Sequence, residues 1–149
     1  MQNPYEKSTD KLTIITISDI LGSKSQLEKL KDWYLTEQIR DVDLLVLTGN
    51  IDKLTLYSKD LNNYEYSYSE AEISEILTFL EFFSSPVIYV PGTHDPYTLY
   101  HPKPDLGHKF SRLTPHSENI HNSFYEVFEN LFIVGFGGSP PTYHHPTKL

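Results

Sequence analysis

Three short segments of the first ninety residues are almost entirely apolar. They are residues 11–18, 44–47 and 87–90, and Leu, Ile and Val dominate all three. Such runs do not alternate between apolar and polar positions, which is typical of strands buried on both faces of a parallel sheet. Each run ends at a polar or glycine-containing turn. The pattern therefore predicts three buried strands.

Two amphipathic segments separate these strands. The apolar face of the first is formed by Leu27, Leu30, Trp33 and Tyr34, and Ser23 or Ser25 can cap its start. The apolar positions of the second are Ile73, Ile76, Leu77 and Leu80. Ser69 and Glu72 match a capping box, which predicts that the second helix begins there. The order strand, helix, strand, helix, strand predicts an α/β fold with a parallel βαβαβ core.

The remaining segments are predicted to be loops, a hairpin and two tails. Residues 53–68 and 96–118 show little periodicity and are interpreted as loops. Residues 120–127 and 131–136 are predicted to form a C-terminal β-hairpin with its turn at Glu129-Asn130. The expected organisation is a flexible tail over 1–10, a domain over 11–138 and a Pro-rich tail over 139–149.

Composition narrows the class of protein. The chain has 149 residues, a formal net charge of −8 and no cysteine. Disulfides, thiolate metal sites and a cysteine nucleophile are thereby excluded. The acidic balance argues against nucleic acid as a partner, because such binding depends on Lys and Arg. No apolar run approaches the ~20 residues that span a bilayer, and no signal peptide is recognisable. These features favour a soluble cytoplasmic protein with no membrane partner.

The three strand ends carry the candidate chemistry. The turns are Asp19-Ile-Leu-Gly22, Gly49-Asn50-Ile-Asp52 and Gly92-Thr-His-Asp95. Ligands of parallel α/β sheets bind just beyond the carboxyl ends of the strands. The three turns are therefore expected to converge at one edge of the sheet.

Taken in order, these turns resemble the motifs of the calcineurin-like metallophosphoesterase family. The sequence has S-D-I-L-G, L-T-G-N-I-D and V-P-G-T-H-D where the family has D-x-H, G-D-x-x-D and G-N-H-D/E. The later N-I-H, the hairpin and V-G-F-G-G-S-P are also similar to the family, so the resemblance covers residues ~11 to ~141. It implies a sandwich of two β-sheets flanked by helices, with the second sheet incomplete in this chain. It also implies a centre of two divalent metal ions that hydrolyses phosphate esters.

The resemblance can be carried over residue by residue at only a few positions. Asp19 matches the first metal-ligand Asp, and His94 matches the catalytic His. Asn50 stands where the family has the Asp that bridges both metals, and a neutral amide binds cations far less well than a carboxylate. Leu21 and Thr93 replace a ligand His and a ligand Asn. The family's later lone His and G-H-x-H motif have no counterpart. Asp19 has an alternative interpretation as a carboxylate that caps the following helix.

Two functions follow as hypotheses. The first is a degenerate, inactive phosphoesterase domain that serves as a structural or interaction subunit. The second is an active phosphoesterase that acts on phosphomonoesters or phosphodiesters, with the missing ligands supplied by another segment or chain. We expect no metal cofactor under the first hypothesis and Mn, Mg, Fe or Zn under the second. We also expect a protein partner to cover the hairpin, because Phe124, Val127, Phe132 and Val134 would otherwise be poorly buried.

Overall fold

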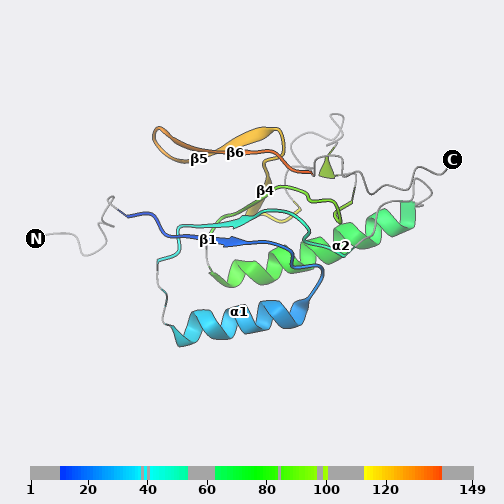
Figure 1. Cartoon of the computed structure of the whole chain (residues 1–149), viewed down its shortest axis with the longest axis horizontal. Coiled ribbons are helices and arrows are strands. Elements are labelled where there is room, and N and C mark those ends of the chain that lie inside the picture. The colour runs from blue at the N-terminus through cyan, green and yellow to red at the C-terminus, as the bar shows by residue number, and fades with distance from the viewer. Residues whose placement is uncertain are drawn as a thin grey trace, which may run out of the picture.

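A four-stranded parallel sheet forms the centre of the fold (Figure 1). Its strands are β1 (Ile14–Ile17), β2 (Leu44–Leu47), β3 (Val87–Tyr89) and β4 (Ser117–Asn119), adjacent in chain order. The computed structural model describes residues 11–37, 39, 41–53, 63–83, 85–96, 99–100 and 113–138, and only the backbone of 63–69. The two predicted tails, 1–10 and 139–149, lie outside the described residues. Within the described residues, the parallel βαβαβ core predicted from the sequence is confirmed.

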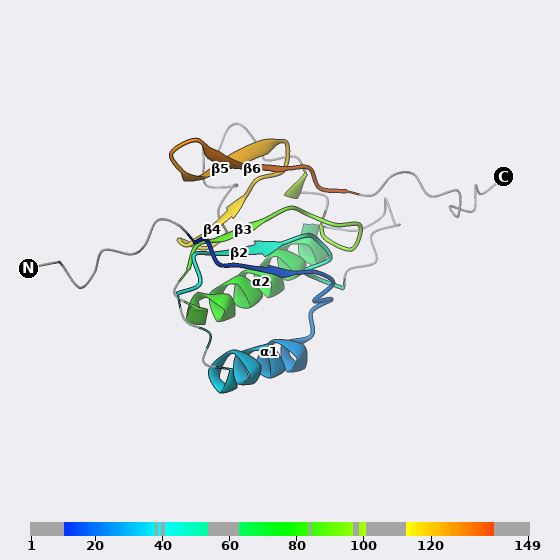
Figure 2. The same cartoon turned by 60° about the vertical axis from the view of Figure 1, so that its left-hand side comes forward.

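Both long helices lie on the same face of this sheet (Figure 2). They are α1 (Lys24–Thr36) and α2 (Asn63–Leu80), and the short 3₁₀ helix η1 (Glu81–Phe83) follows α2. Right-handed crossovers between strands that advance in one direction place successive helices on one side. The prediction that α2 begins at Ser69 was wrong, since the helix already runs through that residue. No Gly or Pro occurs between residues 54 and 85, so the sequence contains no helix breaker that would prevent a start before Ser69.

The two central strands, β2 and β3, are buried on both faces, which explains why they are apolar throughout. The prediction that the first strand is buried as well was wrong, because β1 lies at the edge of the sheet and its residues are exposed or half-buried. On the helix side, Leu45, Leu47 and Tyr89 belong to a core completed by residues of both helices, among them Leu27, Ile73, Ile76, Leu77 and Leu80. On the opposite side, Leu44, Ile88 and Ile120 form a second, smaller core. Alternate residues of β2 thus enter different cores, as strand geometry requires.

The fourth strand was not expected from the sequence. Residues 117–119 fall in the segment interpreted as a loop, and the strand predicted over 120–127 begins three positions too early. β4 reads Ser-Glu-Asn and carries no apolar pattern, so backbone pairing alone identifies it. The N–H of Val87 donates to the carbonyl of His116 at 2.9 Å, and the N–H of Ile120 donates to the carbonyl of Tyr89 at 2.9 Å.

The predicted hairpin is present and lies over the face of the sheet opposite the helices (Figure 2). It consists of β5 (Ser123–Phe128) and β6 (Leu131–Gly135), which are antiparallel and irregular between Glu126 and Phe128. Asn130 takes a positive φ of 68° at the turn, a conformation that Asn tolerates better than most residues. The prediction for Val127 was wrong, because it packs inward with Tyr125 and Ile133 against the second core.

In the described part of the chain, we find no helix with both the length and the apolar character needed to cross a membrane.

Candidate functional site

The loops that follow β1 and β2 run side by side at the carboxyl ends of the strands. The N–H of Leu21 donates to the carbonyl of Asn50 at 2.9 Å, and the N–H of Gly22 donates to the carbonyl of Ile51 at 2.9 Å. The N–H of Asp19 completes the series with a bond of 3.3 Å to the carbonyl of Gly49. These bonds continue the contact between the two strands beyond their ends, so Asp19 and Asn50 face one another.

The side chain of Asn50 joins all three loops. Its Nδ2 donates to Oδ1 of Asp19 at 2.7 Å. Its Oδ1 accepts a bond of 3.1 Å from the N–H of His94 and a weak one of 3.4 Å from the hydroxyl of Thr93. Each side of the amide therefore has a partner that suits it, a carboxylate for the donor and N–H and O–H groups for the acceptor. The structure thus brings together Asp19, Asn50 and the backbone of His94.

Asp19 is exposed and is held in its charged form. The hydroxyl of Ser18 donates to Oδ2, and Asn50 donates to Oδ1. These two hydrogen bonds, Ser18 first, lower the pKa of Asp19 below its ordinary value, and the nearby His94 adds to the effect. The helix-capping interpretation gains no support, since α1 begins only at Lys24 with Ser23 at its N-cap.

The backbone of the first two loops is left-handed at three residues other than glycine. The φ angles are +54° at Asp19, +50° at Leu21 and +55° at Asn50. An L-residue pays roughly 1–2 kcal/mol for this conformation, and a leucine has no polar group with which to offset it. Leu21 is 41% exposed, so little burial compensates the strain either. Such strain is a common feature of functional loops.

Two glycines allow the second and third loops to approach one another. A Cβ atom on Gly92 would lie 2.3 Å from Oδ1 of Asn50 and 2.4 Å from its backbone N. A Cβ on Gly49 would lie 2.8 Å from the Cα of Gly92. All three distances are shorter than real Cβ contacts, so the absence of side chains at these positions is what permits the bonds to Asn50.

The buried carboxyl group of Asp95 connects the second and third loops. This connection was not predicted from the sequence. Asp95 is 2% exposed; its Oδ1 accepts from the N–H of Asp52 at 2.8 Å and its Oδ2 from the N–H of Gly92 at 2.7 Å. Burial outweighs these hydrogen bonds and raises the pKa of Asp95 to about 6. Asp52 is equally buried, and its own Oδ1 accepts from the N–H of Lys53 at 2.7 Å. The signal in the sequence was the Asp that ends both the second and the third turn.

The chain returns to this region after the hairpin. The N–H of Gly138 donates to the carbonyl of Pro91 at 2.9 Å, and the N–H of Gly137 donates to Nδ1 of His121 at 2.9 Å. A Cβ on Gly137 would lie 2.4 Å from the carbonyl oxygen of Pro91, so glycine is required there too. The segment after β6 therefore supports the third loop.

Comparison with models of known protein families identifies the family of this chain. The model of the calcineurin-like phosphoesterase family matches residues 12–147. The chain belongs to this family. No curated protein matches it.

A search of solved structures supports the same fold. One crystal structure superposes with a TM-score of 0.61 at 19% sequence identity. The alignment covers 84% of this chain and 52% of the other, so this chain spans about half the length of that solved structure. At this identity the likeness concerns the fold alone.

The strand-end residues do not fit the two-metal centre that is usual for a calcineurin-like phosphoesterase. Leu21 has no donor atom, and Asn50 turns its amide nitrogen, not its oxygen, toward Asp19. Across the described residues, no three His, Cys, Asp or Glu side chains gather as a group that could hold a metal ion. Among the residues that the structure describes, the three loops converge as in the family, but the family's donor set is not found.

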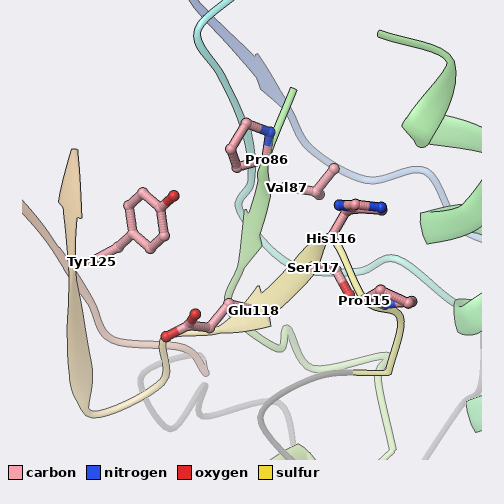
Figure 3. A pocket seen from close by; sticks show the side chains of 7 residues that line it. All are labelled: Pro86, Val87, Pro115, His116, Ser117, Glu118 and Tyr125. Atoms are coloured by element: carbon pink, nitrogen blue, oxygen red, sulfur yellow. The ribbon is translucent and has the colours of Figure 1, made fainter. Parts of the chain in front are cut away.

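A pocket of about 190 Å³ opens at the other end of the strands (Figure 3). It lies where β3 and β4 begin, and Tyr125 of the hairpin forms one wall. Its lining residues are Pro86, Val87, Pro115, His116, Ser117, Glu118 and Tyr125. Asp19, Asn50 and His94 do not line it, so it is separate from the candidate site.

Proposed function

We propose that this calcineurin-like phosphoesterase domain is catalytically silent and serves as a structural and interaction subunit of a larger assembly. The observation that carries the proposal is the side chain of Asn50, which bonds Asp19 through its nitrogen and the backbone of His94 through its oxygen. In this position the amide nitrogen makes a bond to Asp19 that a carboxylate could make only through a cation or a shared proton.

Charge explains why the amide suits a site without metal. A carboxylate at position 50 would place two negative charges 2.7 Å apart, the distance that now joins Asn50 to Asp19. Two carboxylates this close repel unless a cation or a shared proton lies between them. The neutral amide removes this repulsion and replaces it with a hydrogen bond. Hydrogen bonds of Asn50 therefore hold the three loops together without a metal ion.

The hairpin supports the second part of the proposal. Its outer side exposes 59% of Phe124, 48% of Phe132 and 78% of Val134. Contiguous exposed apolar side chains usually mark a surface that another molecule covers. A domain with this face and without a complete catalytic donor set is best suited to binding a protein.

A second function is favoured by one observation. His94 matches the catalytic His of the family, and its electrostatic interaction with Asp19 contributes to the lowered pKa of that carboxyl. An active phosphoesterase would need a further segment or chain to bring metal ligands to Asp19 and His94. In that case His94 would donate a proton to the leaving group of the phosphate ester.

Hydrolysis of small phosphate esters separates the two functions. The wild-type protein is assayed on p-nitrophenyl phosphate and on bis(p-nitrophenyl) phosphate with Mn²⁺, Mg²⁺, Fe²⁺ or Zn²⁺ added in turn. The proposal predicts rates equal to those of the His94→Ala variant with every metal. Metal-dependent hydrolysis that is lost in both His94→Ala and Asp19→Ala would contradict it and establish the second function.

A further inference from the structure

The side chain of His121 joins the turn that enters the hairpin to the segment that leaves it. Its Nδ1 accepts a hydrogen bond of 2.9 Å from the backbone N–H of Gly137. The backbone of His121 is fixed as well, since its N–H donates to Oδ1 of Asn119 at 3.0 Å. The rings of Tyr100 and Phe136 flank the imidazole, with centroids 5.0 and 5.7 Å away. The imidazole is therefore held in one position, with Nδ1 facing Gly137.

This hydrogen bond lies next to the third loop of the candidate site. Gly138 follows Gly137 and donates from its N–H to the carbonyl of Pro91 at 2.9 Å. Gly137 approaches the same carbonyl so closely that a Cβ atom on it would lie 2.4 Å from the oxygen. Pro91 begins the loop that carries His94. We call His121, Gly137, Gly138 and Pro91 the latch, because together they join the end of the hairpin to this loop.

The latch requires His121 to be neutral. A backbone N–H can only donate, so Nδ1 must be unprotonated to accept from Gly137. The proton of the neutral ring then lies on Nε2, which is 3.1 Å from Nδ2 of Asn122, an amide that can turn its oxygen toward this proton. A charged imidazolium carries a proton on Nδ1 too. That proton would face the N–H of Gly137, and the hydrogen bond would be lost.

The neighbours of the ring offer an imidazolium no opposite charge. Tyr100 is the titratable group that packs against it, and burial, with a smaller effect of the nearby Asp95, raises the pKa of Tyr100 to about 12. The phenol therefore stays neutral in the range in which histidine titrates. Phe136 and Asn122, which also contact the ring, carry no charge. These contacts do not compensate for the bond to Gly137 that protonation removes.

We infer that the latch is a pH-sensitive device, in which neutral His121 holds the segment after β6 against the third loop and protonation of His121 releases it. Histidine side chains change their charge between about pH 5 and 8, so the release occurs as pH falls through this range. The third loop, with His94, is then held less firmly. This inference goes beyond the proposed function and holds whether or not the domain hydrolyses phosphate esters.

Hydrogen exchange of the Gly137 and Gly138 amides tests the inference on the full chain by NMR at about pH 5 and about pH 8. After correction for the intrinsic effect of pH on exchange, the protection of both amides should be about tenfold lower at the acid pH, as expected for the loss of one hydrogen bond. The ring signals of His121 should titrate with the same midpoint as the amide signal of Gly137. Protection that is equal at the two pH values would overturn the inference.

Two substitutions of His121 separate the latch from Asp95, whose pKa is raised to about 6 and which therefore titrates in the same range. His121→Asn places an amide oxygen near the position of Nδ1 and does not titrate, so both amides should stay protected at either pH. His121→Phe keeps a ring without an acceptor, and protection should be low at both. His116→Asn changes a histidine of the pocket at the other end of the strands and should behave like the wild type.

A pH dependence that persists in His121→Asn would overturn the inference and assign the effect to Asp95. If His121→Phe does not fold, the comparison of the wild type with His121→Asn still decides. None of these measurements depends on hydrolysis, so the proposed function is tested separately.

Discussion

The amide nitrogen of Asn50 donates a hydrogen bond of 2.7 Å to the carboxylate of Asp19, across the gap between the loops that follow β1 and β2. The oxygen of the same amide accepts from the backbone of His94 on the third loop. Three segments far apart in the sequence are thus joined by one neutral side chain. In this family a bridging carboxylate and its metal ions would occupy the same place. Here hydrogen bonds to a neutral amide join the loops instead.

The charge state of Asp19 should depend on both of its hydrogen-bond donors. Ser18→Ala should raise the pKa of Asp19 toward its ordinary value, and Asn50→Ala should raise it by less, because the Ser18 bond has the larger effect. The pKa in the folded state lies below the unfolded value, so these bonds stabilise the fold above pH about 4 and the benefit is lost as pH falls through the folded pKa. Carbon-13 NMR of the side-chain carboxyl measures the shift directly.

Thr93→Ala is the matched control for this measurement. The hydroxyl of Thr93 bonds to Oδ1 of Asn50 and not to Asp19, so its removal should leave the pKa of Asp19 where it is. A larger rise in Asn50→Ala than in Ser18→Ala, or an equal rise in Thr93→Ala, would show that the hydrogen bonds act differently from this account.

The strain at Leu21 should be removable. Leu21→Gly replaces an exposed leucine at a φ of +50° with the residue that adopts this conformation without steric cost. We expect an increase in the free energy of unfolding of up to about 1 kcal/mol, measured by urea denaturation. Leu35→Gly makes the same change at an exposed position inside α1 and should lower stability by up to about 1 kcal/mol. Destabilisation by both variants would mean that the Leu21 side chain contributes more than its strain costs.

Gly92 should tolerate no side chain. In Gly92→Ala the new Cβ would lie 2.3 Å from Oδ1 of Asn50, so either Asn50 or the third loop must move. We expect a loss of about 1–3 kcal/mol together with a changed NMR signal from the Asn50 amide. Gly22→Ala is the comparison, since its φ is +68° but its nearest neighbours lie 3.7 Å from the added Cβ. That variant should lose stability through backbone strain alone and keep the Asn50 signal.

Asp95 should make the fold less stable as pH rises from about 4 to about 6. Its pKa is raised to about 6 by burial, so over this range the folded protein binds more protons than the unfolded chain. Stability then falls with increasing pH by an amount on the order of 2 kcal/mol and is constant above. Urea denaturation at several pH values should show this slope in the wild type and not in Asp95→Asn.

Asp95→Asn should also be less stable than the wild type at pH about 4. An amide can accept from the N–H of Asp52 or of Gly92 with its oxygen, but its NH₂ group then faces the other donor. A variant that keeps the full pH dependence would assign the slope to a different group.

Apolar content decided which parts of the fold could be predicted. β2 reads Leu-Leu-Val-Leu and β3 reads Val-Ile-Tyr, both are buried on both faces, and sequence alone located them. β4 reads Ser-Glu-Asn, and only its backbone pairing with β3 makes it a strand. The start of α2 before Ser69 was missed because the polar residues that precede Ser69 carry no apolar pattern, and no Gly or Pro marks a boundary there.

Some features of the candidate site could be predicted from the sequence and others could not. A parallel sheet brings its carboxyl ends to one edge, so the meeting of the three loops follows from topology. The orientation of the Asn50 amide does not, because it depends on the left-handed backbone at Asp19 and Asn50. The tie made by Asp95 depends likewise on burial and on N–H groups of other loops. Motif spacing carries none of this information.

Calorimetric titration with Mn²⁺ tests most directly whether the Asn50 amide has taken the place of a metal centre. The wild-type protein should show no heat of binding, and the double variant Leu21→His, Asn50→Asp should gain affinity because it restores a ligand and a bridging carboxylate. Tight binding of Mn²⁺ by the wild type, lost on Asp19→Ala, would contradict the account.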